Sequence, residues 1–296
     1  MALIATSTSS VIPQDRDMVD LATLKTQMVR HGVKNISRRG LNTIEIKTSS
    51  DAFINLSKSK LILTCRIKTA AGADLVYDPL AQVPQYSDVS VVNSFLHSVF
   101  SSFSVFTNTN KNEVLYHSVH GNFGLYNYIK ALRKQQKKLT FKRTDGFSVD
   151  TTGPEITSMH GGNAGLNDRG SRFFGSRLVC FSGDLGFPIA EEQVLLPPGL
   201  GLFIEAEFAS DILNLLIPAA LPNDANDIHY KLEIASLEVD LCETYLRPQA
   251  FLGYTDVLST QDFTRFFTDH EIKVFILDYI IKAILIKIYL SPYCQR

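Results

Sequence analysis

The closest pair of histidines in the chain is His117 and His120, and imidazoles at this spacing could share a metal ion. A zinc site needs three or four protein ligands, and no third ligand stands beside this pair at a spacing typical of such sites. We therefore expect two ordinary histidines near strand ends and no metal centre. A metal enzyme remains an alternative that bound metal would reveal.

The motifs of the common catalytic and phosphate-binding sites are missing from the sequence. The glycine-rich stretch from Gly161 to Gly170 lacks the G-K-[ST] ending of a phosphate loop, and there is no G-x-S-x-G nucleophile elbow. A cupin-type enzyme would need an H-x-H pair with a downstream glutamate, and the chain has no H-x-H. The sequence predicts no catalytic residues, no cofactor and no enzyme activity.

A basic stretch runs from Leu125 to Arg143 and contains no acidic residue. We expect a helix over its first part. It has two interpretations: a patch that contacts the phosphates of DNA, or a solvated helix and loop. The second is favoured, so DNA binding is expected to be weak if present. No aromatic interleaving adds a signal for single-strand binding. The residues of the candidate patch are Lys130, Arg133, Lys134, Lys137 and Lys138.

Composition predicts a folded body of one large or two smaller domains. The chain has 296 residues, of which 45% are hydrophobic and 10% aromatic, so a sizeable core is available. The formal net charge of −1 creates no overall field that would attract nucleic acid or a membrane. The N-terminus has no signal-peptide pattern. The four cysteines lie far apart in the sequence, which favours buried free thiols in a reducing compartment: Cys65, Cys180, Cys242 and Cys294.

The elements around which the chain is organised are predicted between Val89 and His117. Apolar residues recur at the spacing of one helix face, which predicts a helix of about three turns: Val92, Phe95, Leu96, Val99, Phe100 and Phe103. From Phe103 to Phe106 the pattern becomes that of a strand, Asn108–Asn112 supplies a turn, and a second strand follows at 114–116. This helix and hairpin must dock on a larger sheet, because a two-stranded hairpin alone is marginal in water.

Other segments alternate between apolar and polar residues as antiparallel strands do. In Ile228–Leu241 the apolar positions change from even to odd, which predicts a β-bulge near Ala235 and Ser236. Many short strands with little helical pattern predict an all-β sandwich or jelly roll. The remaining strands are expected within Leu41–Thr48, Lys60–Lys68, Ser176–Ser182 and Leu200–Phe208.

Three blocks of sequence resemble, in order and spacing, the major capsid proteins of Maverick/Polinton elements and their adintovirus relatives. These capsid proteins belong to the double jelly-roll class that includes adenovirus hexon. The first block is Val92-Asn93, Phe95-Leu96-His97-Ser98 and Phe100-Ser101. The second is Asn163-Ala164-Gly165-Leu166, Gly175-Ser176-Arg177 and the turn Leu195–Gly199, and the third runs from Tyr230 to Pro248. The resemblance covers roughly residues 51–248.

The resemblance implies a structural subunit of an icosahedral shell, located in the virion capsid and assembled in a host cell. Three copies would associate into a pseudo-hexagonal capsomer that contacts neighbouring capsomers and, where present, penton and minor capsid proteins. Its signature core would be Val92, Phe95, Leu96, Val99 and Phe100. The main alternative is a jelly-roll module that binds a carbohydrate or receptor without assembling.

Three regions follow from the resemblance and the patterns. Residues 1–40 are expected to be a mobile arm, 41–247 the first jelly roll, and 248–296 a linker with a truncated or aberrant start of a second barrel. Glu271–Leu290 is rich in Ile, Leu and Lys, and lacks the alternation of a strand. Its charges lie on several sides of a helix, so no membrane span is predicted.

Overall fold

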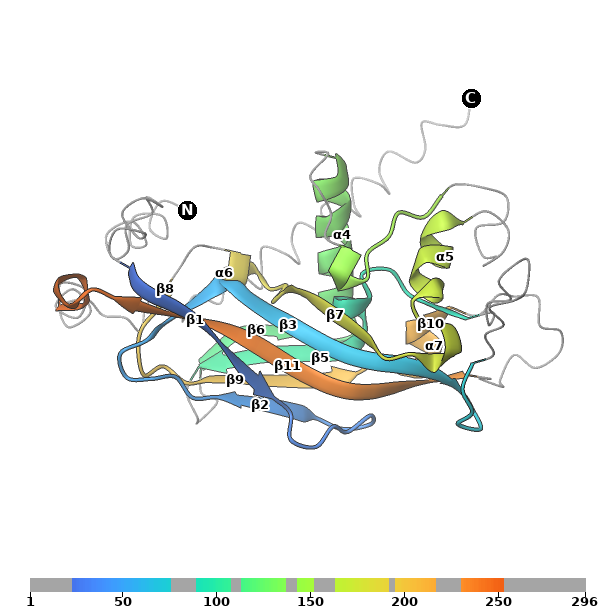
Figure 1. Ribbon diagram of the computed structural model, residues 1–296, viewed down its shortest axis with the longest axis horizontal. Coiled ribbons are helices and arrows are strands. Elements are labelled where there is room, and N and C mark those ends of the chain that lie inside the picture. Colours follow the sequence, from blue (N-terminus) through green and yellow to red (C-terminus); the bar gives the residue numbers. More distant parts are fainter. Residues whose placement is uncertain are drawn as a thin grey trace, which may run out of the picture. The chain divides into compact units, whose positions relative to one another are not determined.

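The computed structural model describes residues 23–75, 89–107, 113–136, 143–151, 163–191, 195–216 and 230–252. Residues up to Pro248 belong to one compact unit that spans Ile12–Pro248, and this unit is the body shown in Figure 1. The last four described residues, 249–252, belong to a second unit and are helical. The predicted turn at 108–112, the C-terminal segment 271–290 and Cys294 lie outside the described residues.

The first sheet is antiparallel and has the strand order β1-β11-β3-β7, with the short β8 paired to β3. Its two central strands, β3 and β11, are 17 residues long and run side by side. Its strands are β1 (Thr23–Gly32), β3 (Phe53–Thr69), β7 (Val179–Asp184), β8 (Leu195–Leu196) and β11 (Tyr230–Leu246).

The second sheet is also antiparallel and has the strand order β2-β9-β5-β6. Figure 1 shows it stacked against the first sheet, so that the two form a sandwich. Its strands are β2 (Asn42–Ile46), β5 (Phe100–Thr107), β6 (Glu113–Ser118) and β9 (Leu202–Phe208).

The pairing of the eight main strands is nested. Counted along the chain, the first strand pairs with the eighth, the second with the seventh, the third with the sixth and the fourth with the fifth. The eighth also pairs with the third, and the seventh with the fourth. A chain folded back on itself as four nested pairs, then rolled into two sheets, is a jelly roll. The predicted fold class is confirmed.

Helices and short strands fill the ends of the sandwich and the connections. The two-residue strands β4 and β10 pair with each other. The elements are β4 (Ser90–Val91), α3 (Phe95–Ser98), α4 (Asn122–Gln136), η1 (Arg143–Asp145), α5 (Ala164–Ser171), η2 (Phe174–Ser176), α6 (Pro188–Glu191), α7 (Asp211–Asn214) and β10 (Leu215–Leu216).

Alternation in the sequence decides which face of each strand enters the core. On β3, Leu61, Leu63, Cys65 and Ile67 are fully buried, as their spacing predicted. The register of β11 against β3 shifts between Ile234 and Ser236, so the predicted bulge is confirmed. A second register shift lies between Asp240 and Cys242. The apolar pattern of the sequence did not predict it.

The predicted N-terminal arm, residues 1–40, extends too far along the chain, because Thr23–Gly32 form the strand β1. β1 is the edge strand of the first sheet and pairs along its length with β11. Its residues are mostly polar and exposed, so no apolar alternation marks it in the sequence. Its strand conformation depends on the partner strand more than 200 residues away.

The predicted three-turn helix is reduced to α3, a single turn of four residues. It begins after Ser94, which has a positive φ of 52°, and by Phe100 the chain has entered β5 and pairs with Phe208 of β9. The helical spacing arose because a short helix and the following strand bury side chains in the same core. The hairpin predicted after the helix is confirmed as β5 and β6.

The connection between β6 and β7 contains α4, η1, α5 and η2. One further expectation needs correction. Cys65 and Cys242 are buried free thiols, but Cys180 is exposed, because it lies on the outer face of β7 opposite Thr64. The helix expected at the start of the basic stretch is present as α4.

Candidate functional site

The histidine pair lies near the end of β6, as the sequence predicted. The Nδ1 of His117 is 2.8 Å from the hydroxyl oxygen of Ser104 on the neighbouring strand β5. His120 follows in an exposed turn with a φ of 58°. Within the described ranges, no group of three or more His, Cys, Asp and Glu residues could hold a metal ion.

The predicted signature core is brought together where α3 meets the two sheets. Phe95, Leu96, Val99 and Phe100 are completely buried, whereas Val92 is partly exposed. The ring of Phe95 lies 5.0 Å from that of Phe181 on β7, and the ring of Phe100 stacks 5.4 Å from that of Phe208 on β9. These side chains connect the two sheets and have a structural role.

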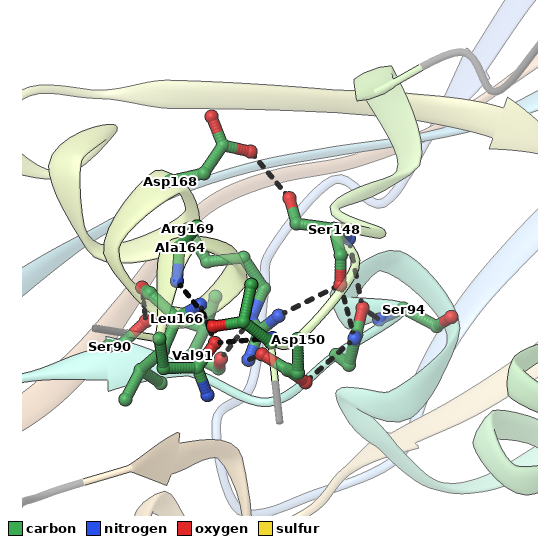
Figure 2. A network of polar contacts seen from close by, with 12 residues as sticks. Ser90, Val91, Ser94, Ser148, Asp150, Ala164, Leu166, Asp168 and Arg169 are labelled. Atoms are coloured by element: carbon green, nitrogen blue, oxygen red, sulfur yellow. Dashed lines mark hydrogen bonds and ion pairs between the residues drawn. The ribbon is translucent and has the colours of Figure 1, made fainter. Parts of the chain in front are cut away.

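A buried arginine forms the centre of the polar network in Figure 2. Arg169 on α5 is 2% exposed. Its Nε donates to the carbonyl oxygen of Val91 at 3.0 Å and its Nη1 to that of Ser148 at 3.2 Å, while its Nη2 is 3.0 Å from the Asp150 carboxylate. Burial lowers the pKa of the guanidinium, and the Asp150 charge opposes this shift. The arginine thus fastens α5, β4 and the segment after η1 to one another.

The amide of Asn93 joins the same network from the opposite side. Its oxygen accepts from the backbone N–H of Ser148 at 3.1 Å, and its nitrogen donates to the carbonyl oxygen of Ser148 at 2.6 Å. The nitrogen is also 3.2 Å from the Asp150 carboxylate. Asn93 therefore pairs with one residue of the β6–β7 connection as a neighbouring strand would.

The start of α5 is held by a cap and by a close backbone contact. Asn163 accepts from the N–H of Leu166 at 3.2 Å, and so satisfies one of the free amides of the first helical turn. A Cβ at Gly165 would lie 2.4 Å from the carbonyl oxygen of Val149, so only glycine allows this approach. Two blocks that carry the sequence resemblance, at Asn93 and at 163–166, thereby meet in space.

Sequence reasoning missed Arg169, the residue that organises this network. A single arginine in a polar, glycine-rich stretch carries no spacing signal, since its partners are mainly backbone carbonyls of distant segments. The network uses its donors and acceptors to hold loops together, and the hydroxyl of Ser148 extends it by donating to the Asp168 carboxylate at 2.5 Å. It is an anchor for the long β6–β7 connection.

Only part of the predicted basic patch can be placed. Lys130 on α4 is 2.6 Å from the Glu191 carboxylate, which also accepts from the hydroxyl of Tyr126 at 3.0 Å. Arg133 is exposed on the same helix. Lys134 lies in α4 but its side chain is not described, and Lys137 and Lys138 lie outside the described residues. Glu191 therefore offsets the first charge of the patch within the chain.

One face of α4 is apolar and exposed; we call it the α4 stripe. It consists of Leu125, Ile129 and Leu132, which are 52%, 40% and 36% exposed and stand at the i, i+4 and i+7 positions. The opposite face is fixed to the sandwich, where Phe123 is buried and Asn127 donates to the carbonyl oxygen of Gly186 at 3.0 Å. Figure 1 shows α4 extending away from the two sheets.

The outer face of the first sheet carries charges of both signs that pair with each other. Arg30 on β1 donates two hydrogen bonds to Asp240 on β11, at 2.7 and 2.9 Å, which lowers the pKa of that carboxyl. Arg66 on β3 is 2.7 Å from Glu233 on β11. This face is therefore largely neutralised by its own cross-strand pairs.

The outer face of the second sheet is acidic instead; we call it the acidic face. Glu45, Glu205 and Glu207 point outward from β2 and β9, around the half-buried rings of Phe106 and Phe203, which stand in register on neighbouring strands. The four strands of this sheet contain no Lys or Arg. The sequence did not reveal this face, because its members come from three separated segments.

In the part of the chain that the structure describes, no helix is long and apolar enough to cross a membrane.

Comparison with known proteins finds structural likeness only. No family model and no curated protein matches the sequence. A chain in the 3.5 Å cryo-EM structure of the Sputnik virophage is similar over 77% of this chain and 49% of its own length, with 9% identity and a TM-score of 0.46. The mavirus major capsid protein is similar over 79% of this chain and 47% of its own length, with 9% identity and a TM-score of 0.37.

The chain thus bears a distant structural resemblance to proteins of virophages, and it spans about half the length of the two that it matches. The nested strand pairing by itself makes this domain a jelly roll.

Proposed function

We propose that the protein is a structural subunit of an icosahedral shell, a major capsid protein of the Maverick/Polinton double jelly-roll class. The observation that carries the proposal is the nested pairing of eight strands in two sheets, an architecture that capsid domains share with lectins and cupins. Since one fold hosts many functions, the choice among these classes needs a second argument.

That second argument is how two asparagines of the blocks that carry the resemblance, and the buried Arg169 near them, are used. Asn93, Asn163 and Arg169 bind backbone groups of other segments, so they hold long connections in place. A rigid framework of this kind suits a protein whose function is to present surfaces to its neighbours. The proposed role involves no catalysis and no cofactor, and it locates the protein in a virion capsid assembled in a host cell.

The proposed assembly is a homotrimeric capsomer that contacts neighbouring capsomers, with penton and minor capsid proteins as further partners. Closed association requires complementary patches on each subunit, and permanent complexes typically bury more than about 2,000 Å². Packaged DNA is at most a weak partner, because Lys130 is already paired with Glu191.

Electron microscopy and light scattering of the full-length chain test this function. Trimers or shell-like particles are expected. A monodisperse monomer that binds a glycan or a receptor ectodomain, with no particle at any concentration, would instead establish the binding-module alternative. Binding to glycan arrays should be measured on the same preparation, so that both outcomes are read from one sample.

A further inference from the structure

We infer that the α4 stripe of one copy docks on the acidic face of a second copy of this chain. The inference deepens the proposed capsid function, on which it rests for its assembly context, by naming the two surfaces that meet. It follows from the exposed apolar residues of α4, from the charges of the two surfaces and from the way each surface is held.

The α4 stripe has the form of a preorganised binding surface. Its three side chains are exposed although they are aliphatic, and they project from a helix whose other face is anchored by Phe123 and Asn127. A surface that is already rigid loses little conformational entropy on binding. Exposed apolar groups gathered on one helix face, next to charged groups, are typical of an interface centre with a polar rim.

The charges of the two surfaces are opposite. The 15 residues of α4 include three cations and no acid, and with Lys130 paired to Glu191, Arg133 remains exposed beside the stripe. The acidic face carries three glutamates; Glu45 is 3.1 Å from Lys47 just beyond β2, and Glu207 accepts from the hydroxyl of Ser102 at 3.3 Å. Opposite potentials steer encounter and fix the register of two partners.

The acidic face also offers an apolar centre. Phe106 and Phe203 stand in register on β5 and β9, and Val114 on β6 continues the row, so a strip of half-buried apolar side chains crosses the sheet. Glu205 and Glu207 lie beside this strip on β9. The aliphatic stripe would cover the strip while Arg133 reaches the glutamates.

Other pairings of these surfaces fit less well. Two α4 helices in contact would bring Arg133 of each copy near the cations of the other. The outer face of the first sheet offers few unpaired charges, because Arg30 and Arg66 already bind acids on β11. A contact between two different patches is heterologous, and such contacts close into rings when the rotation allows, which is the geometry a trimer needs.

The first test is self-association of the full-length chain, measured by sedimentation velocity over a concentration series. Ile129→Asp is expected to raise the dissociation constant more than tenfold. Leu178→Asp is the matched control, since Leu178 is 57% exposed but lies outside both surfaces, and it should leave association unchanged. Equal effects of the two substitutions would overturn the inference.

The second test exchanges the charges. Arg133→Glu and Glu207→Lys should each weaken self-association, and an equimolar mixture of the two variants should associate again, because the unchanged helix of one fits the unchanged sheet of the other. A contact between two α4 helices would not be weakened by Glu207→Lys, because Glu207 lies on β9. Failure of the mixture to recover, with both variants folded by circular dichroism, counts against the acidic face as the partner.

The outcomes separate this inference from the proposed function. Trimers or particles that form equally well with Ile129→Asp would leave the capsid function intact and overturn the docking. Association of the wild-type chain into another closed species, abolished by Ile129→Asp and rescued by the charge exchange, would support the docking without the trimer. Binding of the monomer to anionic vesicles or duplex DNA through α4, with no self-association, would replace the second copy by that partner.

Discussion

The rings of Phe103 and Phe123 stack face to face, with centroids 4.3 Å apart and an angle of 3° between their planes. This contact joins α4 to the second sheet, because Phe103 lies on β5 and Phe123 in the first turn of α4. It determines where the α4 stripe stands relative to the sandwich.

Phe123→Ala is expected to destabilise the fold by about 3 to 5 kcal/mol, since it removes a fully buried aromatic side chain and leaves a cavity. Leu178→Ala, at an exposed position, should change the free energy of unfolding by less than about 0.5 kcal/mol. Denaturant midpoints at low protein concentration measure both. Similar midpoints for the two variants would mean that α4 is not anchored through this ring.

Gly165→Ala is expected to cost about 3 kcal/mol, because the new Cβ would collide with the backbone of Val149, which has no flexible end that could move aside. Gly201→Ala is the control. A Cβ there would meet only the carbonyl oxygen of Ile46 at 3.6 Å, an ordinary contact, so the change should stay below about 1 kcal/mol. Thermal unfolding of both variants provides the comparison, and a harmless Gly165→Ala would contradict the close approach.

Arg169→Met should destabilise by about 3 kcal/mol or more, since it removes a donor from the buried carbonyl of Val91 and the only cation paired with Asp150 among the described residues. The carbonyl of Ser148 keeps its bond from Asn93. Arg169→Lys should also destabilise, because an ammonium cannot reproduce the planar fork. Arg172→Met, which breaks a more exposed pair with Asp168, is expected to cost at most about 1 kcal/mol. Urea unfolding ranks the three variants, and a rank order that puts Arg172 first would remove Arg169 from its central role.

The thiols of the folded chain should differ in reactivity. Burial raises the pKa of the Cys65 and Cys242 thiols and hides them from reagents, whereas Cys180 is exposed. Iodoacetamide at pH 8 should therefore label Cys180 in the native protein, and Cys65 and Cys242 only after unfolding. Peptide mapping by mass spectrometry reads each site separately, with Cys180→Ser as the control, and rapid native labelling of Cys65 would contradict its place in the core.

Two aspartates should make opposite contributions to the pH dependence of stability. Burial raises the pKa of Asp145 above its usual 3.8, so the folded state holds the proton to higher pH than the unfolded state does. The folded state therefore loses stability as the pH rises from the usual pKa through the raised one. Asp145→Asn is therefore expected to gain stability relative to wild type as the pH rises above 3.8.

The contrasting variant is Asp240→Asn. Arg30 lowers the pKa of Asp240, so its contribution is present above the usual pKa and is lost as pH falls through the lowered value. At neutral pH the free energy of unfolding of the wild type should be slightly higher than that of this variant, and the difference is small because the ion pair is partly exposed. The difference should vanish in acid. Urea midpoints of wild type and both variants, measured across the pH range, test both predictions. If the two variants differ from wild type by the same amount at every pH, the pKa shifts of Asp145 and Asp240 are contradicted.

Strand alternation and phase are properties of the sequence itself, and they determined the sandwich. The inward residues of β3, the bulge of β11 and the β5–β6 hairpin follow from a period of two that neighbouring residues report directly. Such features depend on burial of one face of each strand, which is a local requirement.

Tertiary structure alone decided the features that depend on distant partners. β1 is a strand because β11 lies beside it, and α3 ends after one turn because Phe100 pairs with Phe208. Arg169 is buried because carbonyl groups from two other segments surround it, and the acidic face exists because β2 and β9, some 160 residues apart, are neighbours. Hydrogen bonding between strands and burial of polar groups are settled by the whole fold, so no window of sequence contains them.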